Sequence, residues 1–394
     1  MNVTDTLPAA RRTVWLLSAC QALLLTNGVT LIAISALAGY MLADNKALAT
    51  LPATAFVLGS WSSTVPASLW MKRVGRRAGF LTGGAFGVVA SLVATLGMGV
   101  GSLAVLCVGL FLFGIYNAFG QYYRFAAADA APADFKAKAI SFVLAGGLAG
   151  GIVGPAVSQW TREFAQPTYL ATFASLALFS LASMAILSRL AIPATAEGTS
   201  QGDARPLREI AAQPAFLVAA TVAAFGYATM TLLMTATPLA MGFCGHPYSA
   251  SAHVISAHVI GMFAPSFVTG SLIKRFGVLT VMAVGVVLLF ICIGIGLSGQ
   301  AIAHFWWALV LLGVGWNFTY IGGSTLLTET YRPSERAKAQ GANEMAVFTV
   351  QAVASFSSGV LVNTRGWDTL NYVAIPMVGT CAIAIAWLAA RRRT

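Results

Sequence analysis

The stretch VLTVMAVGVVLLFICIGIGLS, residues 278–298, contains no charged side chain. A helix that crosses a bilayer needs about 20 predominantly apolar residues, so this stretch is long enough to span one. The rest of the chain has the same character: it is 58% hydrophobic and 9% charged, with a mean hydropathy of +0.79. Soluble domains carry about a quarter charged residues, and membrane β-barrels need alternating segments instead of continuous apolar runs. The sequence therefore predicts an all-α membrane protein.

Working outward from this stretch gives twelve apolar segments. They lie near 13–42, 48–71, 78–98, 102–124, 138–161, 168–190, 215–242, 250–273, 278–298, 302–328, 339–362 and 369–390. If the N-terminus is inside, every Lys and Arg except Lys46, Arg162 and Arg365 falls on the inner side. This asymmetry is what the positive-inside rule requires. It accounts for the net charge of +11 without nucleic acid as a partner, and it predicts twelve spans with both termini in the cytoplasm.

The chain also repeats itself. A polar stretch at 191–213 separates six segments from six, which predicts an N-terminal six-helix bundle at 1–190, a cytoplasmic linker at 191–213 and a C-terminal six-helix bundle at 214–394. Tyr116-Asn117 in the first half returns as Trp316-Asn317 in the second. A basic loop also recurs, with Arg73, Gly75, Arg76 and Arg77 in the first half and Lys274, Arg275 and Gly277 in the second. Duplicated halves of this kind are typical of transporters that rock around a midplane site.

These features resemble the major facilitator superfamily over essentially the whole chain. The first basic loop is similar to the family's Gly-x-Leu-x-Asp-Arg-x-Gly-Arg-Arg motif, but Ser68 replaces the first Gly and Lys72 replaces the Asp. Lys274 again stands at the acidic position in the second half. The resemblance implies two pseudo-symmetric six-helix bundles and transport by alternating access, without the charge latch attributed to that Asp.

Polar side chains inside the spans are the candidates for holding a solute, because lipid penalises them. No carboxylate falls inside the first, fourth, seventh or tenth segment, which argues against a cationic organic substrate. Met230 and Met234 share one face of the seventh segment, and His258 and Met262 share one face of the eighth at matching depth. Thioether and imidazole together favour copper. The alternative is that the methionines are flexible core filler and that the substrate is organic.

The stretches around these four residues resemble the CcoA-type copper importers of bacteria. The resemblance implies that Met230, Met234, His258 and Met262 bind the metal and that copper is the transported substrate, with no organic cofactor. It further implies a bacterial inner-membrane protein that supplies copper for cytochrome oxidase assembly, with copper chaperones or oxidase assembly factors as partners. The sequence leaves the oligomeric state open, with a monomer as one option. Bacterial riboflavin importers share much of this scaffold. Transport of a neutral or aromatic organic solute such as riboflavin is therefore the alternative, favoured by 23 Phe, 10 Tyr and 9 Trp.

Two further groups of residues are candidates. Met241, Cys244 and His246 could capture metal at the outer mouth, or the last two could be ordinary loop residues. Five amides are expected to line the cavity or to join neighbouring helices: Gln21, Asn27, Asn117, Gln121 and Asn317. The chain contains no GxSxG, HExxH or phosphate-loop motif, so no enzymatic activity is expected.

Overall fold

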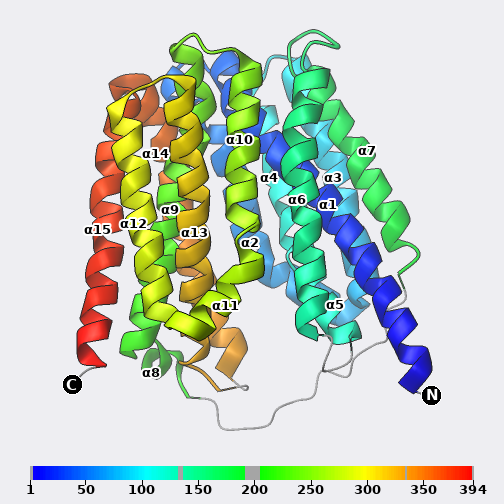
Figure 1. Cartoon of the computed structure of the whole chain (residues 1–394). Helices are drawn as coiled ribbons and strands as arrows, with labels where there is room; N and C mark the ends of the chain where they lie inside the picture. The colour runs from blue at the N-terminus through cyan, green and yellow to red at the C-terminus, as the bar shows by residue number, and fades with distance from the viewer. Residues whose placement is uncertain (1–2, 132–135, 191–204, 333–334, 393–394) are drawn as a thin grey trace. The chain divides into compact units, whose positions relative to one another are not determined.

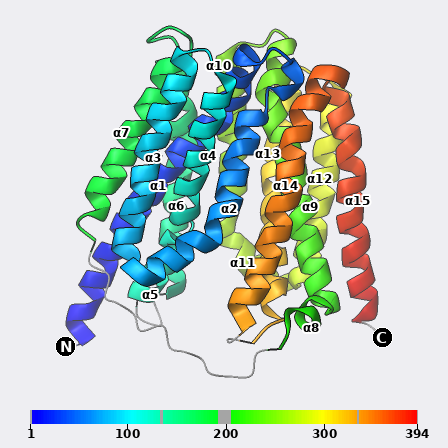
Figure 2. The ribbon, with the colours of Figure 1, turned by 180° about the vertical axis from the view of Figure 1, so that it is seen from behind.

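The structure, a computed structural model, describes residues 3–131, 136–190, 205–332 and 335–392. The chain divides into two compact units, Met1–Ala196 and Glu197–Thr394. Figures 1 and 2 show the first in blue to green and the second in green to red. The division falls inside the predicted linker 191–213.

The N-terminal unit is built on the pairing of α1 with α6 and on the packing of α4 against both α2 and α3. Its last helix, α7, packs on α3. The elements are α1 (Val3–Leu42), the short 3₁₀ helix η1 (Lys46–Leu48), α2 (Leu51–Val74), α3 (Arg76–Gly99), α4 (Leu103–Gly120), α5 (Tyr123–Ala130), α6 (Lys136–Thr161) and α7 (Leu170–Leu187).

The C-terminal unit repeats this pattern. The helix α13 packs against α12, α10 and α9, and α9 also packs against α14 and α15. Its elements are α8 (Leu207–Ala211), α9 (Pro214–Phe243), α10 (Tyr248–Phe263), α11 (Ser266–Phe276), α12 (Val278–Ser298), α13 (Ile302–Thr328), α14 (Arg336–Arg365) and α15 (Trp367–Arg391).

Each of the twelve predicted segments coincides with a helix or a bent pair of helices, so the all-α membrane fold is confirmed. Within the described ranges, nine helices are long and apolar enough to cross a membrane, and α10 with α11 forms a tenth span bent by 41°. The helices α2 and α6 occupy the other two predicted positions. The bend lies at Pro265, whose ring cannot continue a regular helix. The short helix α8 lies within the predicted linker 191–213.

Close helix crossings repeat in the two units. A Cβ added to Gly114 of α4 would lie 2.2 Å from the Phe56 carbonyl oxygen of α2. A Cβ added to Gly313 of α13 would lie 2.5 Å from the His258 carbonyl oxygen of α10. Small residues at such crossings let membrane helices approach backbone to backbone. These contacts hold α2 against α4 and α10 against α13.

The basic loops share one backbone conformation. Gly75 and Gly277 have φ angles of 84° and 86°, and each is the single residue between two consecutive helices. The Gly75 amide donates to the Met71 carbonyl, and the Gly277 amide donates to the Ile273 carbonyl, both at 2.9 Å. With ψ near 150°, this conformation is essentially restricted to glycine.

Candidate functional site

Four aromatic side chains meet in the C-terminal unit. Trp316 and Tyr320 lie one turn apart on α13 and stack, with ring centroids 4.9 Å apart. Tyr227 of α9 meets both rings edge-on, at 5.3 and 5.4 Å, and Phe263 at the end of α10 approaches Trp316 at 6.3 Å. These separations and angles are favoured for aromatic pairs. The cluster therefore brings planar apolar faces together from three helices.

The aromatic cluster also carries an unused donor. Trp316 is 5% exposed, and its indole N–H has no hydrogen-bond partner among the described residues. A buried donor without a partner is costly, so this N–H is suited to an acceptor on a ligand. Tyr227 and Tyr320 are only partly buried. This cluster was not predicted from the sequence, although the four-residue spacing of Trp316 and Tyr320 indicates that they share a helix face.

Asn317, next to Trp316, is fully engaged at the α10–α11 bend. Its Nδ2 donates to the Met262 carbonyl and to Ser266 Oγ, both at 2.7 Å. Its Oδ1 accepts from Thr269 Oγ1 at 2.7 Å. The side chain is 1% exposed. Asn317 thus joins α13 to both halves of the bent span α10–α11, which is one of the two roles expected from the sequence. The other expected role, lining a cavity, stays a prediction.

Asn117 joins the corresponding helices of the N-terminal unit. Its Nδ2 donates to Ser60 Oγ at 3.1 Å, joining α4 to α2. Gln121 Nε2 donates to Asn117 Oδ1 at 3.4 Å. Asn117 is partly buried and Gln121 is exposed. Asn117 and Asn317 thus each join the fourth span of their unit to the helix before the basic loop, through serines at different positions.

The two amides of α1 differ in their surroundings. Asn27 is 1% exposed and its Nδ2 donates to Ser180 Oγ of α7 at 3.0 Å. Its Oδ1 has no hydrogen-bond partner among the described residues. Gln21 is partly buried. Asn27 therefore joins two helices and keeps one acceptor for a ligand or a water molecule, while the predicted role of Gln21 stays a prediction.

The predicted metal quartet lies deep in the packing of the C-terminal unit. Met230, Met234 and Met262 are 2%, 6% and 7% exposed, and His258 is fully buried. His258 Nδ1 lies 2.8 Å from the Leu309 carbonyl oxygen of α13. The helix α10 packs mainly on α13, whereas α9 and α10 share only a minor interface. His258 therefore has a packing partner on α13.

The outer-loop residues join two loops. Cys244 Sγ donates to Gln300 Oε1 at 3.0 Å, and His246 Nε2 lies 2.7 Å from the Gln300 carbonyl oxygen. Partial burial and nearby Asp368 raise the pKa of the Cys244 thiol, which disfavours the thiolate needed for metal binding. Met241 is fully buried. Cys244 and His246 thus tie the α9–α10 loop to the α12–α13 loop.

The basic-loop residues lie at helix ends. Arg77 Nη2 donates to the Ser188 carbonyl after α7. Arg275 lies over the Phe276 ring, 5.2 Å from its centroid. Arg73 and Lys274 are exposed in the last turns of α2 and α11, and Arg76 begins α3. Each loop thus lies beside the ends of spans of its own unit, a position that suits cations that anchor helices at a membrane surface.

Comparison with known proteins identifies near relatives. The chain is 39% identical to the riboflavin transporter RfnT of Brucella anthropi over 380 residues, which cover 96% of each chain. It is 30% identical to YddS, an uncharacterized transporter of Bacillus subtilis, over 362 residues that cover 86% of this chain and 82% of the relative. The solved structure of the nucleoside transporter NupG matches with a TM-score of 0.74 at 13% identity, covering 96% of this chain and 99% of that one. The last match shows the fold alone.

The prediction that copper is the transported substrate is wrong. The 39% identical relative is named a riboflavin transporter, and the described residues contain no group of three or more His, Cys, Asp or Glu that could hold a metal. Methionine is a flexible filler of packed helices, so its helical spacing alone does not indicate a ligand. The copper chaperones and oxidase assembly factors expected as partners, and the metal-capture role of Met241, Cys244 and His246, lose their basis together with copper.

The family assignment rests on the length of the match. The pattern of the Major Facilitator Superfamily matches residues 15–255 and 227–394, which together leave out only the first 14 residues. The fold, with its multiple membrane-spanning helices, agrees with that match. The resemblance found in the sequence is thereby confirmed, and the chain belongs to the Major Facilitator Superfamily.

Proposed function

We propose that this protein transports riboflavin or a closely related flavin across the membrane. The observation that carries the proposal is the 39% identity to RfnT over 96% of both chains. The match extends through both compact units of the chain, so the relative is similar to the whole of it and not to one half alone. Transport of riboflavin is the alternative that the sequence left open.

The aromatic cluster supports a flavin as the solute. The isoalloxazine ring of riboflavin is planar and uncharged, and planar rings bind well against aromatic faces. Tyr227, Trp316 and Tyr320 supply such faces. The Trp316 N–H, which lacks a partner among the described residues, would donate to a carbonyl of the ring.

Charge supports the same class of solute. Riboflavin is neutral and needs no buried counter-ion, whereas an ionic solute would require one. Glu335 stands at the N-cap position of α14, and Asp368 lies in the first turn of α15, so both acids stand at helix ends. Glu344 lies in the third turn of α14, is only partly buried, and accepts a hydrogen bond from Asn343 Nδ2. Amides such as Asn27 and Asn117 suit the hydroxyls of a ribityl chain.

Transport would proceed by alternating access, with the halves 1–190 and 214–394 joined by the linker 191–213. The positive-inside rule favours both termini in the cytoplasm, and the protein would lie in the inner membrane of a bacterium. The protein acts as a carrier without enzymatic activity, so riboflavin would cross chemically unchanged.

The test is uptake of tritiated riboflavin by bacterial cells that neither make nor import riboflavin and that express this chain. We expect saturable uptake that unlabelled riboflavin inhibits and unlabelled uridine does not. Chromatography of the cell contents at the earliest time point should recover the label as riboflavin. Cells with an empty vector are the control. An uptake rate equal to that control, at a verified level of the protein in the membrane, would refute the proposal.

A further inference from the structure

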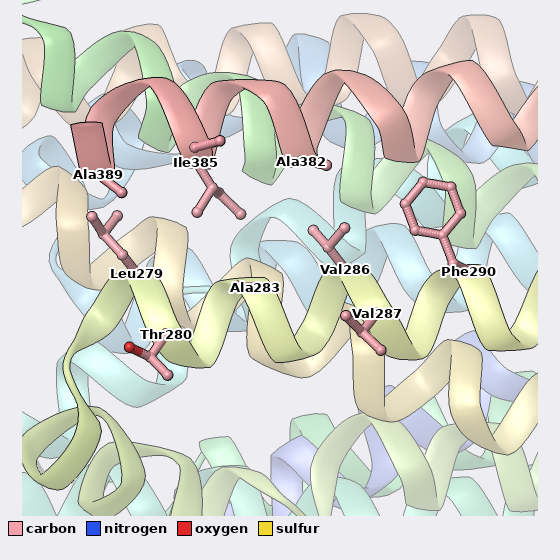
Figure 3. Close-up of a pocket in the computed structure, with 10 residues that line it drawn as sticks. Leu279, Thr280, Ala283, Val286, Val287, Phe290, Ala382, Ile385 and Ala389 are labelled. Carbon is pink, nitrogen blue, oxygen red and sulfur yellow. The ribbon is translucent and has the colours of Figure 1, made fainter. Parts of the chain in front are cut away.

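An apolar groove runs along the surface of the C-terminal unit between α12 and α15. Its volume is about 500 Å³. In Figure 3, Leu279, Val286 and Phe290 of α12 point toward α15, and Ile385 of α15 points back toward α12. The groove is lined by Leu279, Thr280, Ala283, Val286, Val287, Phe290, Ala382, Ile385, Ala386 and Ala389.

Small side chains create this groove. Its α15 wall is a stripe at 382, 385, 386 and 389, which is one face of a helix, and three of these four residues are alanine. Ala283 lies opposite on α12. Thr280 carries the one hydroxyl in the lining, and the other lining side chains are apolar. The groove is therefore suited to an apolar ligand from the surrounding bilayer.

The groove is as long as one leaflet is deep. From Leu279 to Phe290 the helix rises by about 16 Å at 1.5 Å per residue. Half of the hydrocarbon core of a bilayer is about 15 Å. Because α12 begins at Val278, the groove starts at one membrane surface and ends near the bilayer centre.

Cations gather at the surface end of the groove. Lys274 and Arg275 lie in the last turn of α11, a few residues before Leu279, and both are exposed. Arg391 follows two residues after Ala389. Arg392 is paired with Glu329, whereas no ion pair within the described ranges includes Lys274 or Arg275. The groove therefore has a positive mouth and an apolar interior.

We propose that this groove binds one acyl chain of an anionic phospholipid, whose headgroup phosphate is held by Lys274, Arg275 and Arg391. Acyl chain burial contributes the hydrophobic part of the binding free energy. Basic residues at a membrane surface attract anionic lipid and select it over zwitterionic lipid. The arrangement combines both contributions at one site, and it does not depend on which solute the protein transports.

The test is native mass spectrometry of the purified, delipidated full chain titrated with phosphatidylglycerol or phosphatidylcholine. We expect one phosphatidylglycerol to bind with higher affinity than any phosphatidylcholine. Lys274→Gln/Arg275→Gln should weaken the phosphatidylglycerol site by about fivefold for each cation removed. The matched control is Lys72→Gln/Arg73→Gln, which removes the same charges from the repeated loop and should leave this site unchanged.

Filling the groove tests its apolar part. Ala386→Phe adds a ring at an exposed position of the lining and should abolish the tight phosphatidylglycerol site. Ala174→Phe, at an exposed position on α7, is the control and should retain it. Equal affinity for phosphatidylglycerol and phosphatidylcholine would overturn the proposal. So would an equal loss of phosphatidylglycerol affinity in the two double variants. A dimer of this protein that Ala386→Phe dissociates would show that a second copy occupies the groove, and would also overturn the proposal.

Discussion

Arg205 and Glu335 form a two-point ion pair, in which Arg205 Nε and Nη2 donate to the two carboxylate oxygens at 2.8 and 2.7 Å. The Glu335 side chain is fully buried. It also accepts from the backbone amides of Arg205 and Arg332, both at 2.9 Å. Hydrogen bonds between ionised groups in this bidentate geometry are the strong ones. The pair fastens the segment before α8 to the loop between α13 and α14.

This ion pair makes stability depend on pH. The Arg205 side chain, followed by the Arg332 amide, holds the pKa of Glu335 well below its usual value of 4.5. A carboxylate with a lowered folded-state pKa stabilises the protein above its unfolded-state pKa and loses that contribution as pH falls toward the folded-state value. We therefore expect Glu335→Gln to lower the melting temperature at pH 7. The difference from the native chain should shrink below about pH 4.5.

Thermal melting in detergent between pH 3 and pH 7 measures this effect. Glu329→Gln is the matched control, because Glu329 pairs with Arg392 but is about half exposed, and exposed pairs contribute little. If the melting temperature of Glu335→Gln differs from that of the native chain by the same amount at every pH, the prediction is contradicted.

Gly277→Ala should lower stability by about 1–3 kcal/mol, because an alanine at its φ of 86° is strained. A Cβ there meets nothing within 4 Å, so the loss would come from backbone conformation and not from a clash. Gly379→Ala, inside α15 with equally open space, is the control and should be neutral or slightly stabilising. Equal melting temperatures for the two variants would exclude the strain.

Asn317→Ala should lower stability by about 1–3 kcal/mol, since it leaves polar groups of the α10–α11 bend without their partner. Asn117→Ala removes a single, less buried contact to Ser60 and should have a smaller effect. Chemical or thermal unfolding of the purified variants compares the two. If Asn317→Ala melts like the native chain, the brace is not needed to hold the bend.

Met230→Leu/Met234→Leu should transport riboflavin at a normal rate. The two thioethers are buried in helix packing, and an exchange of Met for Leu conserves volume at a cost usually under about 1.5 kcal/mol. Labelled-riboflavin uptake at several concentrations measures both the maximal rate and the half-saturating concentration. A large rise in the latter would place these sulfurs at the solute.

The sequence predicted the fold well because the bilayer dictates the length and apolar character of each span. The bend at Pro265 was not predicted, since proline is tolerated within membrane helices and 250–273 remains apolar around it. The site was predicted less well. Four-residue spacing shows that His258 and Met262 share a face, but it does not show that this face packs on α13. The aromatic cluster joins α9, α10 and α13, so its members become neighbours only when the helices pack.

Trp316→Leu should raise the half-saturating concentration for riboflavin uptake by about 3- to 10-fold, which corresponds to the binding free energy of one aromatic contact. Trp316→Phe keeps a ring but removes the unpartnered N–H, so its effect should be intermediate. Trp307→Leu is the matched control on the same helix, because Trp307 is 55% exposed on the outer surface of α13 and should leave uptake unchanged. The maximal rate should fall less than the apparent affinity, since a stacking contact made equally in the ground state and the transition state affects binding alone. If Trp316→Leu and Trp307→Leu show the same uptake curve, the flavin does not bind at this cluster, and the amides of α1 and α4 become the next residues to substitute.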